Sequence, residues 1–309
     1  MKLPPIAHVA PRRLGEAVSR LADAPPGQAL PLAGGQSLVP LLASRDRTPR
    51  LLVDLRDLGE LTGVGEHDGF LRIGAMTRQH TLATHARIGA AAPLVAEAAA
   101  RTGHASVRHR GTFGGTLAHA AHPAQLVVAA YALDARLLVS GPGGARTTVL
   151  RSLLAGPGLR HDEILTAVEL PLRGPGSGHA FGQVAHPVGG RPVASVAAVV
   201  DTAPDGTVLR AEVTVGTRVS PPTAVDVTHR LRDAGAAAGE TVPTGPGRPH
   251  RQRPPTGPPA AYCRHVVRVL ADRVLTEAIT RARRPGAGAP PVPSGSGHDA
   301  PPVPTRETP

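Results

Sequence analysis

The stretch LAGGQSLVPLL, residues 32–42, places two adjacent glycines, an amide and a hydroxyl between two apolar segments. Glycine lets a backbone approach a ligand closely because it has no Cβ, and successive N–H groups can form a nest that binds an anion. The hydroxyl of Ser37 adds a further donor. The pattern suits a phosphate, although paired glycines alone more often mark a tight turn.

Two common nucleotide-binding patterns do not fit this stretch. No Gly-Lys-Ser/Thr follows the glycines, so it is not a Walker loop, and Gly-x-Gly-x-x-Gly is absent. GVGEHDG, residues 63–69, has the wrong spacing for the latter pattern and is predicted to be a turn.

A second glycine pair occurs in GTFGGT, residues 111–116, directly after the basic residues Arg108, His109 and Arg110. It is predicted to form a second glycine-rich loop that again sets Gly-Gly beside hydroxyls. Two such loops could clamp the two phosphates of one diphosphate. Two unrelated turns remain the alternative on this pattern alone.

The rest of the chain alternates between helical and extended patterns. Helices are predicted over 12–24, over 77–86 with Thr77 as N-cap, over 93–102 with Gly103 after its end, and over 261–284. Strands are predicted over 28–35, 50–55, 70–75 and 162–171, and a hairpin over 192–217 around Pro-Asp-Gly. This mixture predicts a fold that combines helices and sheets.

Length and composition favour two globular domains. The 309 residues are enough for two cores, and 41% of them are hydrophobic. Only 2% are aromatic, so the cores must consist of Ala, Val, Leu and Ile.

The formal net charge of +11 first suggests nucleic acid or an anionic membrane as partner. The aromatic side chains that stack on bases are nearly absent, and Lys2 is the only lysine. We therefore expect no nucleic-acid partner.

One cysteine, Cys263, excludes an internal disulfide framework and an iron–sulfur cluster held by this chain's own thiolates. The histidines of residues 104–122 lack the carboxylates and spacing of a metal site, so no metal is expected. No apolar run of membrane-spanning length and no signal peptide is evident, which favours a cytoplasmic protein.

Five motifs occur in a fixed order: LAGGQSLVPLL, LLVDLRDLGEL, LRIGAMTRQHTL, VRHRGTFGGTLAHA and DEILTAVELP. With them the chain resembles the FAD-binding medium subunit of the molybdenum hydroxylases, of the carbon monoxide dehydrogenase and xanthine dehydrogenase types. The similarity spans residues 6–171 and continues more weakly to YCRHVVRVLADRVLTEA.

The resemblance implies an α+β fold. Residues 1–173 would form an FAD-binding domain of the PCMH type with two α/β subdomains, and residues 178–283 a smaller C-terminal α+β domain with a short antiparallel sheet. The Pro- and Gly-rich segment 235–260 and the tail 284–309 are predicted to be disordered.

The resemblance also implies FAD as cofactor and assigns residues to it. By motif position these are Ala33, Gly34, Gly35, Gln36, Ser37, Leu38, Thr112, Phe113, Gly114, Gly115, Thr116, Gln125 and Leu165. Leu165 could equally be an ordinary core residue of a strand. No catalytic side chain is implied, because the flavin carries the chemistry.

The same resemblance implies two partner subunits. A small [2Fe-2S] subunit would deliver electrons from a large molybdopterin subunit, and FAD on this chain would pass them to NAD, a quinone or oxygen. The chain would then be an FAD-dependent oxidoreductase subunit that works in a heteromer.

Departures from the family pattern lie beside the second loop. Ala121, His122 and Gln125 stand where the family has Asp, Pro and an acidic residue that helps hold the cofactor. Arg191 and Pro192 stand where an acid and a flavin-facing aromatic often occur. A structural subunit with weak or lost FAD binding is therefore one alternative, and a lone nucleotide-binding protein is another.

Overall fold

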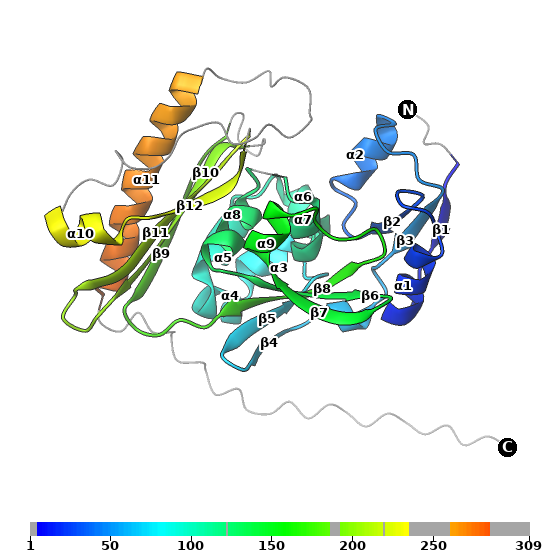
Figure 1. Ribbon diagram of the computed structural model, residues 1–309, viewed down its shortest axis with the longest axis horizontal. Helices are drawn as coiled ribbons and strands as arrows, with labels where there is room; N and C mark the ends of the chain where they lie inside the picture. The colour runs from blue at the N-terminus through cyan, green and yellow to red at the C-terminus, as the bar shows by residue number, and fades with distance from the viewer. Residues whose placement is uncertain (1–4, 122, 186–191, 219, 235–259, 285–309) are drawn as a thin grey trace.

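Three β-sheets follow one another along the chain, and helices separate the second sheet from the third (Figure 1). The computed structural model describes residues 5–121, 123–185, 192–218, 220–234 and 260–284. The mixture of helices and sheets confirms the predicted fold class.

The first sheet is parallel, with the strand order β1-β3-β2. Its elements are β1 (Ala7–Val9), α1 (Leu14–Ala22), β2 (Ala29–Leu32), α2 (Leu38–Ala43) and β3 (Leu51–Asp54). The buried face of α1 packs Val18 and Leu21 against Val53 of β3. Since parallel strands need a crossover, α2 connects β2 to β3, and the segment before α2 lies at the carboxyl end of β2.

The second sheet is antiparallel, with the order β4-β5-β8-β6-β7. Its strands are β4 (Val64–His67), β5 (Phe70–Gly74), β6 (Arg136–Gly141), β7 (Gly144–Val149) and β8 (Ile164–Pro171), and a 3-10 turn η1 (Gly59–Leu61) precedes it. Its helices are α3 (Gln79–Thr84), α4 (Ala86–Ala91), α5 (Pro93–Ala100), α6 (Ala105–Arg110), α7 (Phe113–His119), α8 (Gln125–Ala132) and α9 (Leu150–Ala155).

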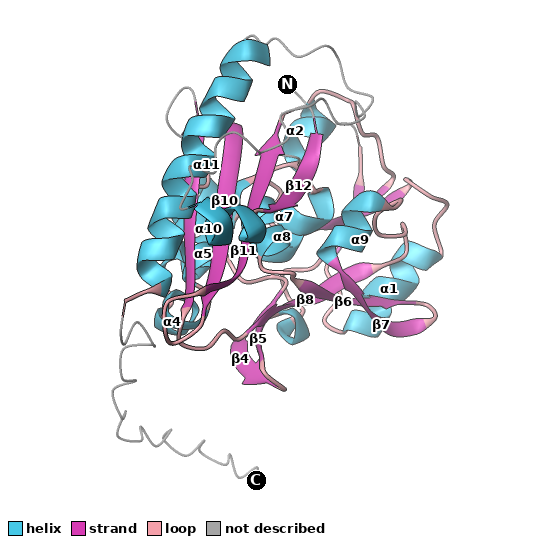
Figure 2. Cartoon of the chain, turned by 60° about the vertical axis from the view of Figure 1, so that its left-hand side comes forward, coloured by secondary structure: helices cyan, strands magenta, loops and turns pink. Residues whose placement is uncertain are grey.

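The third sheet is antiparallel, with the order β12-β11-β10-β9. Its elements are β9 (Ser177–Ala185), β10 (Pro192–Thr202), β11 (Val208–Thr217), β12 (Ser220–Asp226), α10 (Thr228–Ala234) and α11 (Ala260–Ala282). Helix α11 covers one face of β9 and β10, while α5 and α8 pack against the other face (Figure 2). Strand β10 is therefore buried on both sides.

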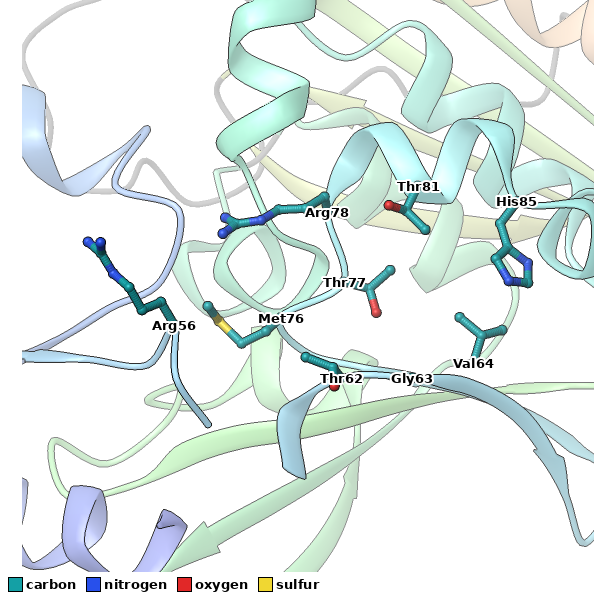
Figure 3. A pocket seen from close by; sticks show the side chains of 9 residues that line it. All are labelled: Arg56, Thr62, Gly63, Val64, Met76, Thr77, Arg78, Thr81 and His85. Carbon is teal, nitrogen blue, oxygen red and sulfur yellow. The ribbon is translucent and has the colours of Figure 1, made fainter. Parts of the chain in front are cut away.

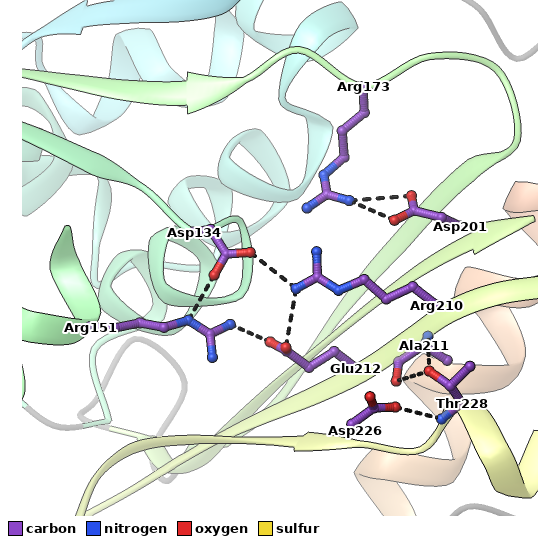
Figure 4. A network of polar contacts seen from close by, with 9 residues as sticks. All are labelled: Asp134, Arg151, Arg173, Asp201, Arg210, Ala211, Glu212, Asp226 and Thr228. Carbon is purple, nitrogen blue, oxygen red and sulfur yellow. Dashed lines mark hydrogen bonds and ion pairs between the residues drawn. The ribbon is translucent and has the colours of Figure 1, made fainter.

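Ion pairs join the third sheet to the segment between α8 and β6 and to helix α9, which belong with the second sheet. Arg151 of α9 and Arg210 of β11 both bind Asp134, at 2.8 and 3.0 Å, and both also pair with Glu212 (Figure 4). The ring of Tyr131 lies 4.5 Å from the Arg151 guanidinium. A shared network of this kind restricts the two parts more than isolated surface pairs do.

Three local predictions were wrong. Helix α3 begins at Gln79, so Thr77 is not its cap; Thr77 is buried, and its carbonyl accepts the N–H of Phe113. GVGEHDG is mostly strand, since residues 64–67 form β4, which pairs with β5.

The third error concerns GTFGGT, which is not a loop, because Gly114 and Gly115 lie inside α7. The predicted disordered segment also ends earlier than expected, since α11 begins at Ala260. The remainder of that segment, 235–259, and the tail 285–309 lie outside the described residues.

Candidate functional site

The first glycine pair lies between β2 and α2, at the carboxyl end of β2. Gly35 has φ +73°, a left-handed conformation that favours glycine, and its carbonyl accepts the N–H of Val39 at 2.9 Å. The amide of Gln36 folds back on the loop and donates to the Gly34 carbonyl at 3.2 Å. The local conformation is therefore fixed by the chain itself.

Three consecutive backbone donors of this first loop have no partner in the described part of the chain. Among the described residues, no acceptor receives the backbone N–H of Gly35, Gln36 or Ser37. Ser37 is exposed, and the other two residues are half-buried. Three consecutive free N–H groups beside a hydroxyl fit an oxyanion such as phosphate.

The second glycine pair is built differently. Thr112 caps α7, where its Oγ1 accepts the N–H of Gly115 at 3.1 Å. The N–H of Phe113 donates to Thr77 and that of Gly114 to Ala75, at 2.9 and 2.8 Å. These donors are used inside the protein, and Thr112, Phe113 and Gly114 are buried. Only Gly115 and Thr116 of the motif remain half-exposed.

The structure brings the two glycine motifs into contact. A Cβ added to Gly34 would lie 2.2 Å from the Arg110 carbonyl oxygen and 2.8 Å from Cα of Gly111. A Cβ on Gly115 would lie 3.3 Å from the Cβ of Ala33. The glycines thus allow two backbone segments to meet, and a side chain at either position would fill the cradle between them.

Gln79 organises the second motif, although its place in the sequence predicts only a helical residue. Its backbone N–H donates to the Gly111 carbonyl at 2.9 Å, and its Nε2 donates to Thr116 Oγ1 at 2.8 Å. A Cβ on Gly111 would lie 2.7 Å from the Gln79 side chain. No local pattern marks this residue, because its partners lie more than thirty positions away.

Two other predicted cofactor residues lie in the protein interior. Leu165 is 5% exposed and packs in the core of the second sheet, opposite Val139, as a strand core residue would. Gln125 is also 5% exposed, and its Nε2 donates to the Arg101 carbonyl at 3.1 Å. A carboxylate could not make that hydrogen bond, since it only accepts.

The departures near the second motif are only partly described. Ala121 is half-buried after α7, and Pro192 is buried at the start of β10. His122 and Arg191 lie outside the described residues.

The observed donors fit one end of FAD better than the other. The free N–H groups of the first loop and the close contact at Gly34 suit the backbone approach that a diphosphate requires. The loop residues Ala33 and Leu38 are half-buried at the two ends of this donor row. The described residues therefore fit the phosphate part of the cofactor.

Within the described part of the chain, no group of three His, Cys, Asp or Glu side chains could hold a metal ion. None of the helices described has both the length and the apolar character that a membrane span needs.

Residues 4–173 match the family described as the FAD binding domain in molybdopterin dehydrogenase. The chain therefore belongs to the FAD-binding subunits of the molybdopterin dehydrogenases, which are oxidoreductase subunits of the molybdenum hydroxylase type. Its cofactor is FAD.

Individual relatives agree over most of the chain. The 6-hydroxypseudooxynicotine dehydrogenase complex subunit alpha of Paenarthrobacter nicotinovorans is 33% identical over 300 residues, which cover 92% of this chain and 97% of the relative. The carbon monoxide dehydrogenase medium chain of Afipia carboxidovorans is 34% identical over 62% of this chain and 67% of its own length.

Solved structures agree as well. Quinoline 2-oxidoreductase from Pseudomonas putida 86 superposes with a TM-score of 0.79 at 28% identity, over 92% of this chain and 100% of the matched chain. A Cu,Mo-CO dehydrogenase structure superposes with a TM-score of 0.78 at 28% identity, over 91% of this chain and 100% of the matched one.

Proposed function

We propose that this chain is the electron-transfer subunit of a molybdenum hydroxylase complex. Its partners are a small [2Fe-2S] subunit and a large molybdopterin subunit. The proposal is supported by relatives named as medium chains or as a subunit of a dehydrogenase complex. The single cysteine also supports it, because this chain cannot ligate an iron–sulfur cluster alone.

The observation that carries the proposal is the contact of the two glycine motifs beside a row of free donors. In this proposal the N–H groups of Gly35, Gln36 and Ser37 bind the diphosphate of FAD. The motif of residues 112–116 contributes Gly115 and Thr116 to the surface, and its buried members hold these two in place.

FAD, when bound, supplies the redox chemistry, taking electrons from the clusters and passing them to an external acceptor. The chain's own residues bind and orient the cofactor, and none of them has to act as an acid or base. Residues 1–173 form the cofactor-binding domain in this proposal, and residues 178–283 form the second domain.

The alternative is a structural subunit of the same kind of complex with weak or lost FAD binding. One observation favours it: the amide of Gln125 is already bound to the Arg101 carbonyl and stands where the family has an acid. That contact stabilises the protein interior instead of holding a cofactor.

The visible absorption spectrum of the purified chain separates the two functions. A flavin spectrum after reconstitution with FAD, with a dissociation constant in the micromolar range or below, supports the electron-transfer subunit. An absent spectrum together with intact binding to the two partner subunits supports the structural subunit. Purification of the native complex, followed by cluster and molybdopterin analysis, tests the partners separately.

A further inference from the structure

A basic cavity lies beside the two glycine motifs. It has a volume of about 400 Å³ and opens between the segment after β3, the start of β4 and helix α3 (Figure 3). Two arginines, Arg56 and Arg78, supply its charge, and the ring of His85 and the hydroxyls of Thr62, Thr77 and Thr81 supply further polar groups. None of the described residues that line it carries a carboxylate.

The first arginine is held in position by a buried acid. Asp54, at the end of β3, is fully buried, and it accepts hydrogen bonds from Nε and the backbone N–H of Arg56 at 2.7 and 3.0 Å. His8 of β1 lies 3.1 Å from the same carboxylate. This arrangement orients the Arg56 guanidinium while Asp54 compensates much of its charge.

The second arginine carries the surplus charge of the cavity. A guanidinium N–H of Arg78 donates to the Arg110 carbonyl, the atom that a Cβ on Gly34 would meet. Arg78 therefore reaches the contact between the two glycine motifs. Among the described residues, no carboxylate pairs with Arg78, so its positive charge is uncompensated there.

The chemistry of this cavity fits a phosphate group carried by a larger molecule. Guanidinium groups bind phosphate through paired hydrogen bonds, and hydroxyls complete such sites. The volume exceeds what one phosphate fills, and Val64 and Met76 add apolar surface to the lining. These features together favour a nucleotide over a free inorganic ion.

We propose that the cavity between Arg56 and Arg78 binds a phosphate of a nucleotide and that Arg78 supplies the positive charge that recognises it. The phosphate comes from one of two sources, the diphosphate of FAD or a second nucleotide bound while FAD is in place. The first source rests on the proposed function, and the second requires only the cavity.

The test uses the full-length chain with ADP and adenosine as probes in calorimetric titrations. ADP is expected to bind at least about tenfold more tightly than adenosine, and Arg78→Gln should remove that difference, because a charge-assisted contact is worth about this much. Arg78→Lys keeps the positive charge and should retain most of the difference in affinity between ADP and adenosine. Arg268→Gln, an equal charge change at an exposed position of α11, should leave ADP binding unchanged.

Titrations with and without FAD distinguish the sources. If ADP and FAD displace one another, the phosphate is that of FAD; if ADP binds the FAD-loaded chain equally well, it belongs to a second nucleotide. Equal affinities for ADP and adenosine in the unmodified chain would overturn the proposal, even if Arg78→Gln fails to fold. Equal ADP affinity in Arg78→Gln and Arg268→Gln would overturn it as well. Direct FAD titration judges the proposed function independently, since ADP binding through Arg78 does not require FAD to bind.

Discussion

Gly34 and Gly35 follow a strand of the parallel sheet and leave neighbouring backbone donors open, whereas Gly114 and Gly115 lie in the first turn of α7, where the donors are satisfied. The first pair is half-buried. Of the second pair, Gly114 is buried against Ala75, where an added Cβ would come within 2.5 Å of the Ala75 Cβ. The two pairs have the same sequence, Gly-Gly, but different structural surroundings.

The difference teaches that a glycine pair can serve a ligand or the protein itself. At the first motif the missing side chains expose donors and allow close approach of another segment. At the second motif they allow a short helix to pack against the chain beside Thr77. The following experiments test this division, from the largest expected effect to the smallest.

Lowering the pH is expected to have the largest effect on the free energy of unfolding. The glycine motifs are therefore best compared at a pH above this loss of stability. Both ring nitrogens of His179 on β9 are buried, without a hydrogen-bond partner among the described residues. Burial, and after it the charges of Arg173 and Arg281, lowers the pKa of His179 from 6.5 to about 4. The unfolded chain therefore binds a proton between these pH values that the folded chain does not.

The free energy of unfolding should fall by about 3 kcal/mol as the pH drops from 6.5 to 4, at roughly 1.4 kcal/mol per pH unit. Chemical denaturation across this range measures the fall, and His179→Phe should flatten it. Arg146 lowers the pKa of Glu163 from 4.5 to about 2, so the stability that Glu163 contributes is lost only below pH 4.5. A slope unchanged in His179→Phe would contradict the assignment.

Gly34→Ala should weaken FAD binding by about a hundredfold, which corresponds to about 2.7 kcal/mol. The reason is that its Cβ would lie 2.2 Å from the Arg110 carbonyl oxygen and would push the two motifs apart. Flavin fluorescence titration above pH 7 measures the effect. The melting temperature of the FAD-free chain should fall as well, because the added Cβ meets backbone atoms of Arg110 and Gly111. Unchanged affinity would show that the contact between the motifs does not shape the cofactor site.

Gly114→Ala should act on folding first. The added methyl group meets Ala75 inside the protein, and overpacking of this kind costs about 2 kcal/mol of unfolding free energy. Denaturant unfolding of the FAD-free chain isolates this cost. A stable Gly114→Ala variant that still lost FAD would instead make the second motif a direct cofactor contact.

Gln79→Leu should cost about 1 kcal/mol of unfolding free energy, because it removes the hydrogen bond to Thr116. It should also lower FAD affinity severalfold, since Thr116 would lose the partner that positions it. The conservative variant Gln79→Glu gives the matched control, because it keeps the shape and removes the Nε2 donor. Full FAD affinity in both variants would limit Gln79 to packing.

Gly15→Ala should have the smallest effect and is the control for all glycine substitutions. Gly15 lies in α1 with nothing within 4 Å of its added Cβ. The substitution should stabilise the chain by about 0.5–1 kcal/mol through helix propensity, with FAD affinity unchanged. A loss of FAD affinity here would show that glycine substitutions act through general destabilisation.

Elements with a strong local pattern were predictable from the sequence. The stripe of Val266, Leu270 and Val274 is the buried face of α11, and Pro-Asp-Gly marks the turn between β10 and β11. Helix α1 and strands β2, β3, β5 and β8 also lie where they were predicted. These signals are local, since side-chain periodicity and turn residues act within one element.

The family and its cofactor also followed from the sequence, because five motifs kept their order. What each motif does in space did not follow. The letters Gly-Gly recur at both sites, and the surroundings that distinguish them come from distant segments: Arg110 for Gly34, and Ala75 for Gly114. The assignment of individual residues to FAD therefore stays a prediction.

The sequence by itself determined the fold class, the order of most elements and the class of ligand. Only the tertiary structure decided that the first glycine pair leaves its donors open, that the second is packed inside, and that Arg78 reaches the junction between them. The physical reason is that a backbone donor is satisfied only when an acceptor from another part of the chain comes within hydrogen-bond distance, and it stays free otherwise. A local sequence pattern contains no information about that distant acceptor.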